Sequence, residues 1–244
     1  MLLPEHDLLR DVYLRGPASS GAVALTFDDG PNGRCTEAVL DALAEAGVPA
    51  AFFVLGRNVA TGRNDALLAR MVREGHTIGV HSQTHGARPA FLHYLTAEEL
   101  YDSTTAIAAA LRRAGIEAPP PVRFFRPPFG FLTGPSARAA AEAGLAIVEW
   151  TVSVEDWRAD QDGEKVARLV LERVRPGDIV LLHDGIRTHQ RSLTRCTDRA
   201  LVADAVRRLV PGLAARGLRV ASLPALLGMD QLRAPALTGS AGGH

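Results

Sequence analysis

The chain has 244 residues, of which 47% are hydrophobic, enough for a sizeable core in one large domain or two small ones. Lysine and arginine together number 27, as do aspartate and glutamate, so the formal net charge is zero. This balance excludes a global field that would recruit nucleic acid or an anionic membrane. The two cysteines, Cys35 and Cys196, match no disulfide or metal-binding pattern, so we expect two reduced structural thiols.

Neither the N-terminal residues nor the apolar runs of this sequence match a targeting or membrane-spanning pattern. The first residues lack a basic leader followed by an apolar run, and no stretch approaches the ~18 apolar residues of a membrane span. We therefore expect a cytoplasmic protein without membrane insertion, or a secreted one if the natural chain has a longer N-terminus. Residues 229–244 are rich in alanine, glycine and serine, which predicts a flexible tail. No pattern indicates an oligomeric state.

Short apolar runs alternate with amphipathic segments along most of the chain. We predict buried strands at 22–27, 50–55, 77–80, 122–125, 145–152, 178–182 and 218–223. We predict helices, several of them ending at a glycine, at 36–46, 65–74, 97–114, 135–143, 163–174 and 198–216. The alternation indicates one parallel α/β domain over residues 22–228, preceded by an N-terminal segment, 1–21. Periodicity alone does not choose between a barrel and an open sheet.

The first predicted strand runs directly into two adjacent carboxylates. Asp28 and Asp29 precede Gly30 and Pro31, so both acids enter a turn. Aspartate, glycine and proline are ordinary turn residues, and the turn taken alone would be unremarkable. Other polar segments also follow predicted strands, and they give the pair a second interpretation, as a place that holds a metal ion and a base side by side.

A histidine pair, His81 and His85, follows the third predicted strand. Their spacing lets two imidazoles reach one zinc ion, although such pairs also occur by chance among structural histidines. One of the two adjacent carboxylates would complete a ligand set that leaves positions open for water and substrate, as in a catalytic site. We expect one divalent metal ion, with zinc first and cobalt, nickel or manganese as alternatives.

Three further segments follow predicted strands: Arg126 to Gly130, Asp156 with Trp157, and Leu181 to Asp184. Together with the two motifs above, and in this order, they resemble the polysaccharide deacetylases, the NodB-homology or carbohydrate esterase family 4 enzymes. The resemblance spans residues 22–227. It implies an irregular (β/α)7 barrel, similar to a TIM barrel, in which the catalytic groups lie at the carboxyl ends of the strands.

The resemblance implies a role for the titratable motif residues. Asp28 would be the general base, and Arg126 would hydrogen-bond this carboxylate and keep it ionised. His183 would be the general acid, with Asp156 favouring its protonated form. Asp29, paired with the two histidines, would be the metal ligand.

The resemblance also implies a substrate pocket. The backbone N–H of Phe129, where the family usually has tyrosine, would bind the oxyanion. Trp157 and Leu181 would enclose the acetyl methyl group, although both could be ordinary core residues. Ser153 stands where many relatives have aspartate, which puts local support and substrate contacts in doubt. The histidines at 76, 93 and 189 match no motif position and stay unassigned.

These assignments predict a metal-dependent hydrolase that removes an N-acetyl group from an amino sugar, oligosaccharide or polysaccharide. An O-acetyl carbohydrate esterase, or a deformylase of a carrier-linked sugar, would use the same residues. A non-catalytic sugar-binding relative should have lost at least one catalytic or ligand residue. This alternative is disfavoured because all five such residues are present: Asp28, Asp29, His81, His85 and His183.

Two segments leave the substrate open. The aromatics of 86–94 could stack on sugar faces at the rim of the site, or could equally pack beneath the loop. The cations of 185–191 would suit a phosphate- or carboxylate-bearing substrate, although a solvated basic loop is the commoner case. The expected partner is an acetylated carbohydrate, with no nucleic acid.

Overall fold

A computed structural model describes residues 11–186 and 199–229. Within these residues nine strands form one sheet, in the order β1-β6-β5-β4-β3-β2-β8-β7, with β9 also pairing with β2. Every pairing between these strands is parallel. The strands are β1 (Val12–Tyr13), β2 (Ala22–Asp28), β3 (Ala51–Val54), β4 (Thr77–Val80), β5 (Phe124–Phe125), β6 (Ala146–Val148), β7 (Val152–Ser153), β8 (Ile179–His183) and β9 (Arg219–Val220).

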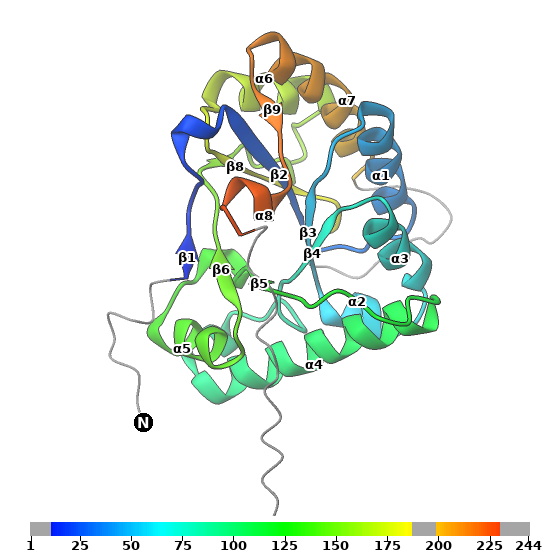
Figure 1. Ribbon diagram of the computed structural model, residues 1–244, viewed down its shortest axis with the longest axis vertical. Helices are drawn as coiled ribbons and strands as arrows, with labels where there is room; N and C mark the ends of the chain where they lie inside the picture. The colour runs from blue at the N-terminus through cyan, green and yellow to red at the C-terminus, as the bar shows by residue number, and fades with distance from the viewer. Residues whose placement is uncertain (1–10, 187–198, 230–244) are drawn as a thin grey trace, which may run out of the picture.

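The sheet curls into an irregular barrel with helices around its outside (Figure 1), which confirms the predicted α/β fold class. Short 3-10 turns lie at η2 (Ala18–Ser20), η3 (Arg88–Phe91) and η4 (Pro128–Gly130). The α-helices are α1 (Arg34–Ala46), α2 (Gly56–Ala60), α3 (Asp65–Arg73), α4 (His93–Arg113), α5 (Gly134–Glu142), α6 (Gly163–Arg173), α7 (Ala200–Ala215) and α8 (Leu223–Leu226).

Alternate residues of the strands face two different cores. Along β2, all of which is buried, Val23, Leu25 and Phe27 belong to the large cluster beneath the outer helices. Ala22 and Ala24 belong to a smaller cluster inside the barrel. That inner cluster takes alternate residues of β3, β5, β6 and β8 together with leucines of α8, which lies in front of the central strands in Figure 1. The helix α8 therefore closes the end of the barrel opposite the strands' carboxyl ends.

The predicted strand 145–152 is wrong as a single element. The structure has β6 and β7 there, separated by Glu149, Trp150 and Thr151. The Glu149 N–H still donates to a carbonyl oxygen of β1, at 2.9 Å. Thr151 bonds β8 instead: its N–H donates to the Ile179 carbonyl oxygen at 3.1 Å, and its Oγ1 accepts from the Ile179 N–H at 3.2 Å. The backbone thus changes its bonding partner from β1 to β8 across Trp150, which lines the cavity described below.

Cys35, in the first turn of α1, is disulfide-bonded, so the expectation of a reduced thiol is wrong for this residue. The sequence pattern of the two cysteines did not indicate a disulfide, because pairing depends on how close two cysteines lie in the folded chain and not on their spacing in the sequence. Cys196 lies outside the described residues, as do His189, most of the basic segment 185–191 and residues 230–244 of the predicted tail.

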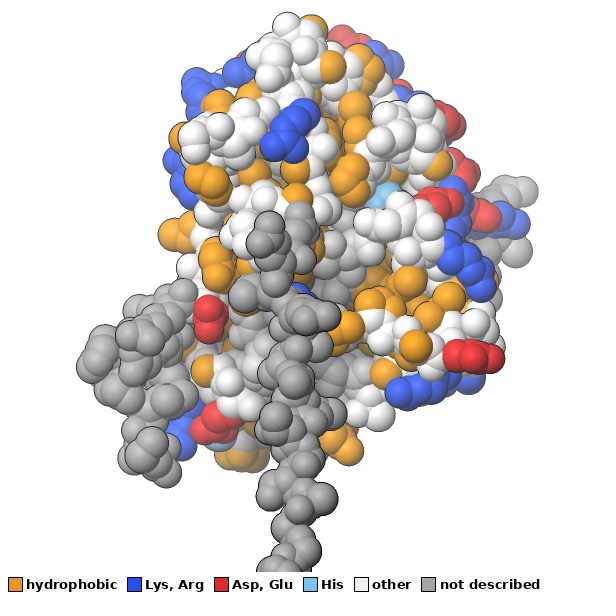
Figure 2. All heavy atoms as spheres, in the orientation of Figure 1, with side chains coloured by type: hydrophobic (Ala, Val, Ile, Leu, Met, Phe, Trp, Pro, Cys, Tyr) orange, Lys and Arg blue, Asp and Glu red, His pale blue; other side chains and the backbone are white. Residues whose placement is uncertain are grey.

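The face drawn in Figure 2 carries charges of both signs. Figure 2 shows acidic and basic side chains around the margin of one face, with neither sign gathered into one patch. Among the described residues, no helix combines the length and the apolar composition that a membrane crossing requires.

Gly79 tests the packing inside the barrel. A Cβ at this position of β4 would lie 2.6 Å from the Phe53 ring and 3.2 Å from the Phe124 carbonyl oxygen. We expect Gly79→Ala to lower the free energy of unfolding by about 1–3 kcal/mol, the usual cost of overpacking, measured by urea denaturation. Gly134→Ala is the matched control because nothing lies within 4 Å of its added Cβ. Equal effects of the two substitutions would contradict this packing.

Candidate active site

The predicted site residues meet at the carboxyl ends of the strands. β2 and β8 pair in a register that sets their last residues, Asp28 and His183, opposite each other. A cavity of about 510 Å³ opens there, lined by Asp28, Asp29, His81, His85, Phe129, Trp150, Trp157, Leu181, His183, Gly185 and Ile186. Eight of the ten predicted residues are in this lining, and the other two, Arg126 and Asp156, are fully buried against it.

Asp29, His81 and His85 form a candidate metal centre. Their ligand atoms all lie within 4.8 Å of one another. Asp29 Oδ1 is 3.7 Å from His81 Nε2 and 3.3 Å from His85 Nε2. His81 Nδ1 lies 2.7 Å from the Arg126 carbonyl oxygen, so the proton belongs on Nδ1 and the Nε2 lone pair faces the carboxylate.

The chemistry of these three residues fits a divalent cation. Asp29 Oδ1 is buried and has no hydrogen-bond partner among the described residues, an arrangement that is costly unless a cation compensates it. Burial, and after it the neighbouring His81, lowers the pKa of His85 to about 4. His85 is therefore neutral, the form in which an imidazole binds metal. Two neutral imidazoles and one carboxylate are a common zinc ligand set.

Arg126 holds the neighbouring carboxylate, Asp28. Its Nη1 donates to Asp28 Oδ1 at 2.7 Å and to Thr26 Oγ1 at 2.8 Å. Its Nε and Nη2 donate to the carbonyl oxygens of Val148 and Glu149, at 2.9 and 3.1 Å. The other carboxylate oxygen, Asp28 Oδ2, lies 3.6 Å from His81 Nε2. Asp28 is thus fixed beside the metal centre, with one oxygen bound to the guanidinium.

His183 is paired with Asp156 on the opposite side of the cavity. Its Nδ1 is 2.8 Å from Asp156 Oδ1, and its backbone N–H donates to Asp156 Oδ2 at 3.0 Å. Burial alone would lower the pKa of His183, but the Asp156 carboxylate outweighs it and raises this pKa above the usual 6.5. Burial likewise opposes the charge of Asp156, yet His183 keeps the pKa of that carboxyl below its usual value. The pair is therefore an imidazolium beside a carboxylate.

Arg199, which the sequence did not single out, completes this side of the site. Its Nη2 donates to Asp156 Oδ2 at 2.8 Å and to the Asp156 carbonyl oxygen at 2.6 Å, while its Nε donates to the His183 carbonyl oxygen at 3.1 Å. The residue is 2% exposed. It precedes helix α7 instead of following a strand, so no motif pointed to it. Its cation offsets the cost of burying the Asp156 carboxylate.

Asp184 packs behind the turn that carries the two acids. A Cβ at Gly30 would lie 2.1 Å from the Asp184 carboxylate, so only glycine fits there without movement. The Thr36 hydroxyl donates a hydrogen bond to this carboxylate, and burial raises the pKa of Asp184 to about 7. Asp184 therefore supports the turn from outside the cavity lining.

The backbone is strained throughout the site. Five non-glycine residues in the described chain have positive φ, between 51° and 71°, and all lie in the motif loops: Asp29, Ser82, His85, Phe129 and Glu155. This conformation is uncommon for residues with a Cβ and typically occurs where function over-determines the backbone. At Asp29 it ends β2 abruptly and separates the directions of two adjacent carboxylates.

Aromatic and apolar side chains enclose the space between the two sides of the site. The Phe129 ring meets His85 edge-on, with centroids 4.6 Å apart, and the Trp157 ring meets His183 in the same way at 4.9 Å. Leu181 is buried and lines the cavity between them. In the segment 86–94, the Phe91 side chain is 58% exposed, so it does not pack beneath the loop.

The two unassigned histidines that the structure describes lie outside the cavity lining. His76 Nδ1 accepts the Ala50 N–H at 3.1 Å, which explains its burial. His93 Nε2 lies 2.7 Å from a carboxylate oxygen of Glu142. Both contacts are structural.

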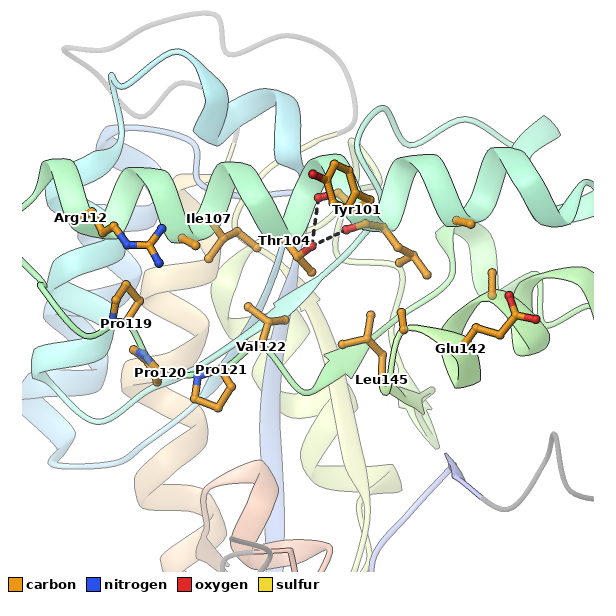
Figure 3. A pocket seen from close by; sticks show the side chains of 15 residues that line it. Tyr101, Thr104, Ile107, Arg112, Pro119, Pro120, Pro121, Val122, Glu142 and Leu145 are labelled. Carbon is orange, nitrogen blue, oxygen red and sulfur yellow. Dashed lines mark hydrogen bonds between the residues drawn. The ribbon is translucent and has the colours of Figure 1, made fainter. Parts of the chain in front are cut away.

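A second cavity of about 560 Å³ lies outside the barrel, between α4, α5 and the proline connector at 119–121 (Figure 3). Figure 3 shows Arg112 and Glu142 at its opposite ends, with apolar side chains between them. Among the described residues, the cluster of Asp29 with the two histidines is the only grouping that could hold a metal ion, and it is not here. This groove therefore lacks the convergent chemistry of the first cavity.

Comparison with known proteins identifies the family. A model described as polysaccharide deacetylase matches residues 15–148. A chitooligosaccharide deacetylase from Bradyrhizobium sp. (strain ANU 289) is 41% identical over 206 residues, which make up 84% of this chain and 90% of that protein. The chain belongs to the polysaccharide deacetylase family. The five motifs of the sequence therefore indicated the family correctly.

Solved structures of the polysaccharide deacetylase family share the fold. The Bc1960 peptidoglycan N-acetylglucosamine deacetylase has a TM-score of 0.78 at 26% identity, over 96% of this chain and 100% of that one. BA3943 from Bacillus anthracis, a family pseudoenzyme, has a TM-score of 0.74 at 23% identity, over 89% of this chain and 69% of that one, a likeness of fold alone. The barrel by itself therefore does not establish catalysis, and the site residues must carry that argument.

Asp156→Asn tests the His183 pair. With the carboxylate gone, burial still opposes the imidazolium and the largest stabilising charge is lost, so the pKa of His183 should fall. If protonated His183 is required, the alkaline limb of the kcat/KM profile should move to lower pH, with His183 titrated by NMR in parallel. Asp162→Asn, which neutralises an exposed carboxylate at the N-cap of α6, is the control and should leave this limb in place. An unmoved limb in Asp156→Asn would reject the pairing as the source of the proton.

Proposed function

We propose that this chain is a metal-dependent deacetylase that hydrolyses the N-acetyl group of an amino sugar within an oligosaccharide or polysaccharide. The observation that carries the proposal is the convergence of three groups on one cavity. These are the metal centre of Asp29 and two histidines, the Asp28 carboxylate held by Arg126, and the His183 imidazole paired with a buried carboxylate. Amide hydrolysis needs a base, an electrophilic stabiliser and an acid in this relation.

The metal centre supplies the electrophile. A divalent ion held by Asp29, His81 and His85 would polarise the acetyl carbonyl and lower the pKa of water. Zinc is our first choice for these ligands, with cobalt, nickel or manganese as alternatives.

Asp28 and His183 divide the proton transfers between them. Asp28 takes a proton from the attacking water, and the Arg126 guanidinium keeps this carboxylate ionised and oriented. The water oxygen bonds to the acetyl carbon, and the carbon–nitrogen bond breaks as His183 Nε2 donates a proton to the leaving amine. The products are acetate and a free amino sugar. The Nδ1 contact with Asp156 fixes which ring nitrogen faces the cavity.

The cavity walls position the acyl group. The Phe129 N–H is our proposed oxyanion donor, since the two prolines before it and the positive φ of Phe129 fix the direction of this backbone group. Trp157 and Leu181 line the cavity next to His183 and form the proposed methyl pocket.

The substrate class rests on the relatives. One is a chitooligosaccharide deacetylase and another a peptidoglycan N-acetylglucosamine deacetylase, so we propose an N-acetylglucosamine-containing chain as substrate. An O-acetyl ester or a formamido sugar would use the same catalytic groups. A non-catalytic sugar-binding role is disfavoured because no catalytic position is vacant. The cytoplasmic location expected from the sequence stays a prediction.

Acetate release tests the activity and the metal together. Metal-stripped protein should release no acetate from chito-oligosaccharides, and added zinc or cobalt should restore release. Asp28→Asn should retain one bound metal while kcat falls by about 10²-fold or more, whereas His81→Ala should lose the metal itself. His93→Ala, outside the cavity, is the control for histidine removal. Near-native turnover by Asp28→Asn would remove this residue from the mechanism.

His183→Ala separates the acid role from general damage. The weakly basic phenolate that leaves an activated aryl ester needs little protonation, whereas the amine that leaves an amide needs a proton. We expect the variant to lose about 10²-fold or more on the amide and much less on an activated acetyl ester, measured as kcat on both substrates. Equal losses on amide and ester would count against the acid role.

A further inference from the structure

Three exposed phenylalanines form a continuous row that starts at the metal centre. Phe129 contacts His85, and the Phe129 and Phe131 ring centroids are 5.3 Å apart. The Phe131 and Phe91 centroids are 5.8 Å apart. The row therefore leads from a metal-ligand candidate inside the cavity to the surface beside the N-terminus of α4.

The exposure of this row sets it apart from every other phenylalanine in the chain. The chain has eight, and five of them are at most 2% exposed: Phe27, Phe52, Phe53, Phe124 and Phe125. The other three are the row, with exposed fractions of 40% for Phe129, 39% for Phe131 and 58% for Phe91. Contiguous exposed aromatic surface next to a cavity typically marks a binding site.

The row is held in place by its backbone. The N–H groups of Gly130 and Phe131 donate to the carbonyl oxygens of Pro127 and Pro128, both at 3.1 Å. The Thr133 hydroxyl donates to the Ala90 carbonyl oxygen, which joins the segment of Phe131 to that of Phe91. A rigid row of rings binds a ligand at a low cost in conformational entropy.

The chemistry of the row suits a sugar chain. A pyranose ring has an apolar face of C–H bonds that packs flat against an aromatic ring, and phenylalanine adds no charge or hydrogen-bond demand. The ring centroids lie 5.3 and 5.8 Å apart with the rings tilted by 36° and 54°, so the three side chains touch and form one continuous apolar surface. A sugar chain that leaves the cavity could lie along this surface.

We propose that Phe129, Phe131 and Phe91 form an aromatic track that binds the sugars next to the one being deacetylated. The inference rests on the proposed function and deepens it, because it names the residues that would bind the rest of the sugar chain. Phe91 and Phe131 determine specificity for chain length. Phe129 is the link between the track and the catalytic cavity.

Chain-length dependence tests the track. The native enzyme should show kcat/KM rising from chitobiose to chitopentaose. Phe91→Ala should lose about tenfold on chitopentaose and far less on chitobiose, and Phe91→Tyr should restore the length dependence because it retains the ring. Tyr101→Ala is the matched control, since this ring is also exposed but lines the separate groove shown in Figure 3. Equal losses at every length, or no loss at all, would overturn the track.

A binding measurement separates the track from the deacetylase activity. Chito-oligomers of each length are titrated calorimetrically into the Asp28→Asn protein, with and without Phe91→Ala. If native protein releases no acetate but longer chains still bind more tightly through Phe91, the proposed activity fails and the track stands. Affinity that is independent of length, or unaffected by Phe91→Ala, rejects the track whatever the activity.

Discussion

The buried guanidinium of Arg126 is the interaction on which the rest of the site depends. Its bonds reach β2 through Thr26 and Asp28 and reach the end of β6 through backbone carbonyls, so one side chain ties together strands that are not neighbours in the sheet. The guanidinium carbon of Arg126 also lies 4.1 Å from the centre of the Phe53 ring, and Phe53 belongs to the inner core. Burying a cation is costly unless each of its N–H donors has a hydrogen-bond acceptor. The need to supply these acceptors holds the ends of β2 and β6 around the guanidinium at the open end of the barrel.

The site consists of two electrostatically distinct sides that meet where β2 pairs with β8. On one side, neutral imidazoles and carboxylates gather without enough positive charge of their own, which is the condition that attracts a metal ion. On the other side, the negative charge of the Asp156 carboxylate is balanced by contacts with both His183 and Arg199. The parallel register places these sides across one cavity, so a single substrate can meet an electron-withdrawing centre and a proton donor together.

The sequence predicted most of the strands, and the residues it proposed for the site lie around one cavity, because strands and strand-end motifs both follow from local pattern. The strand 77–80 and the residues that follow it lie where the apolar run and the histidine spacing placed them. The sequence did not identify Arg199 as a site residue, because an arginine before a helix has no distinguishing local pattern and its partners are distant in the sequence. The bend at Trp150, the bonded state of Cys35 and the meeting of Phe91 with Phe131 likewise depend on tertiary neighbours that periodicity does not encode.

The positive-φ residues of the motif loops have a consequence for engineering. Glycine adopts this backbone conformation without strain, so replacing Ser82 or Glu155 with glycine would relieve local strain, against the added flexibility of the unfolded chain. At Asp29, His85 and Phe129 the same replacement would delete a ligand or a wall of the cavity. Selection for heat tolerance and selection for turnover would therefore favour different residues at these three positions. Variants selected for heat tolerance and turnover together should therefore accumulate their changes in the outer helices and leave this rim intact.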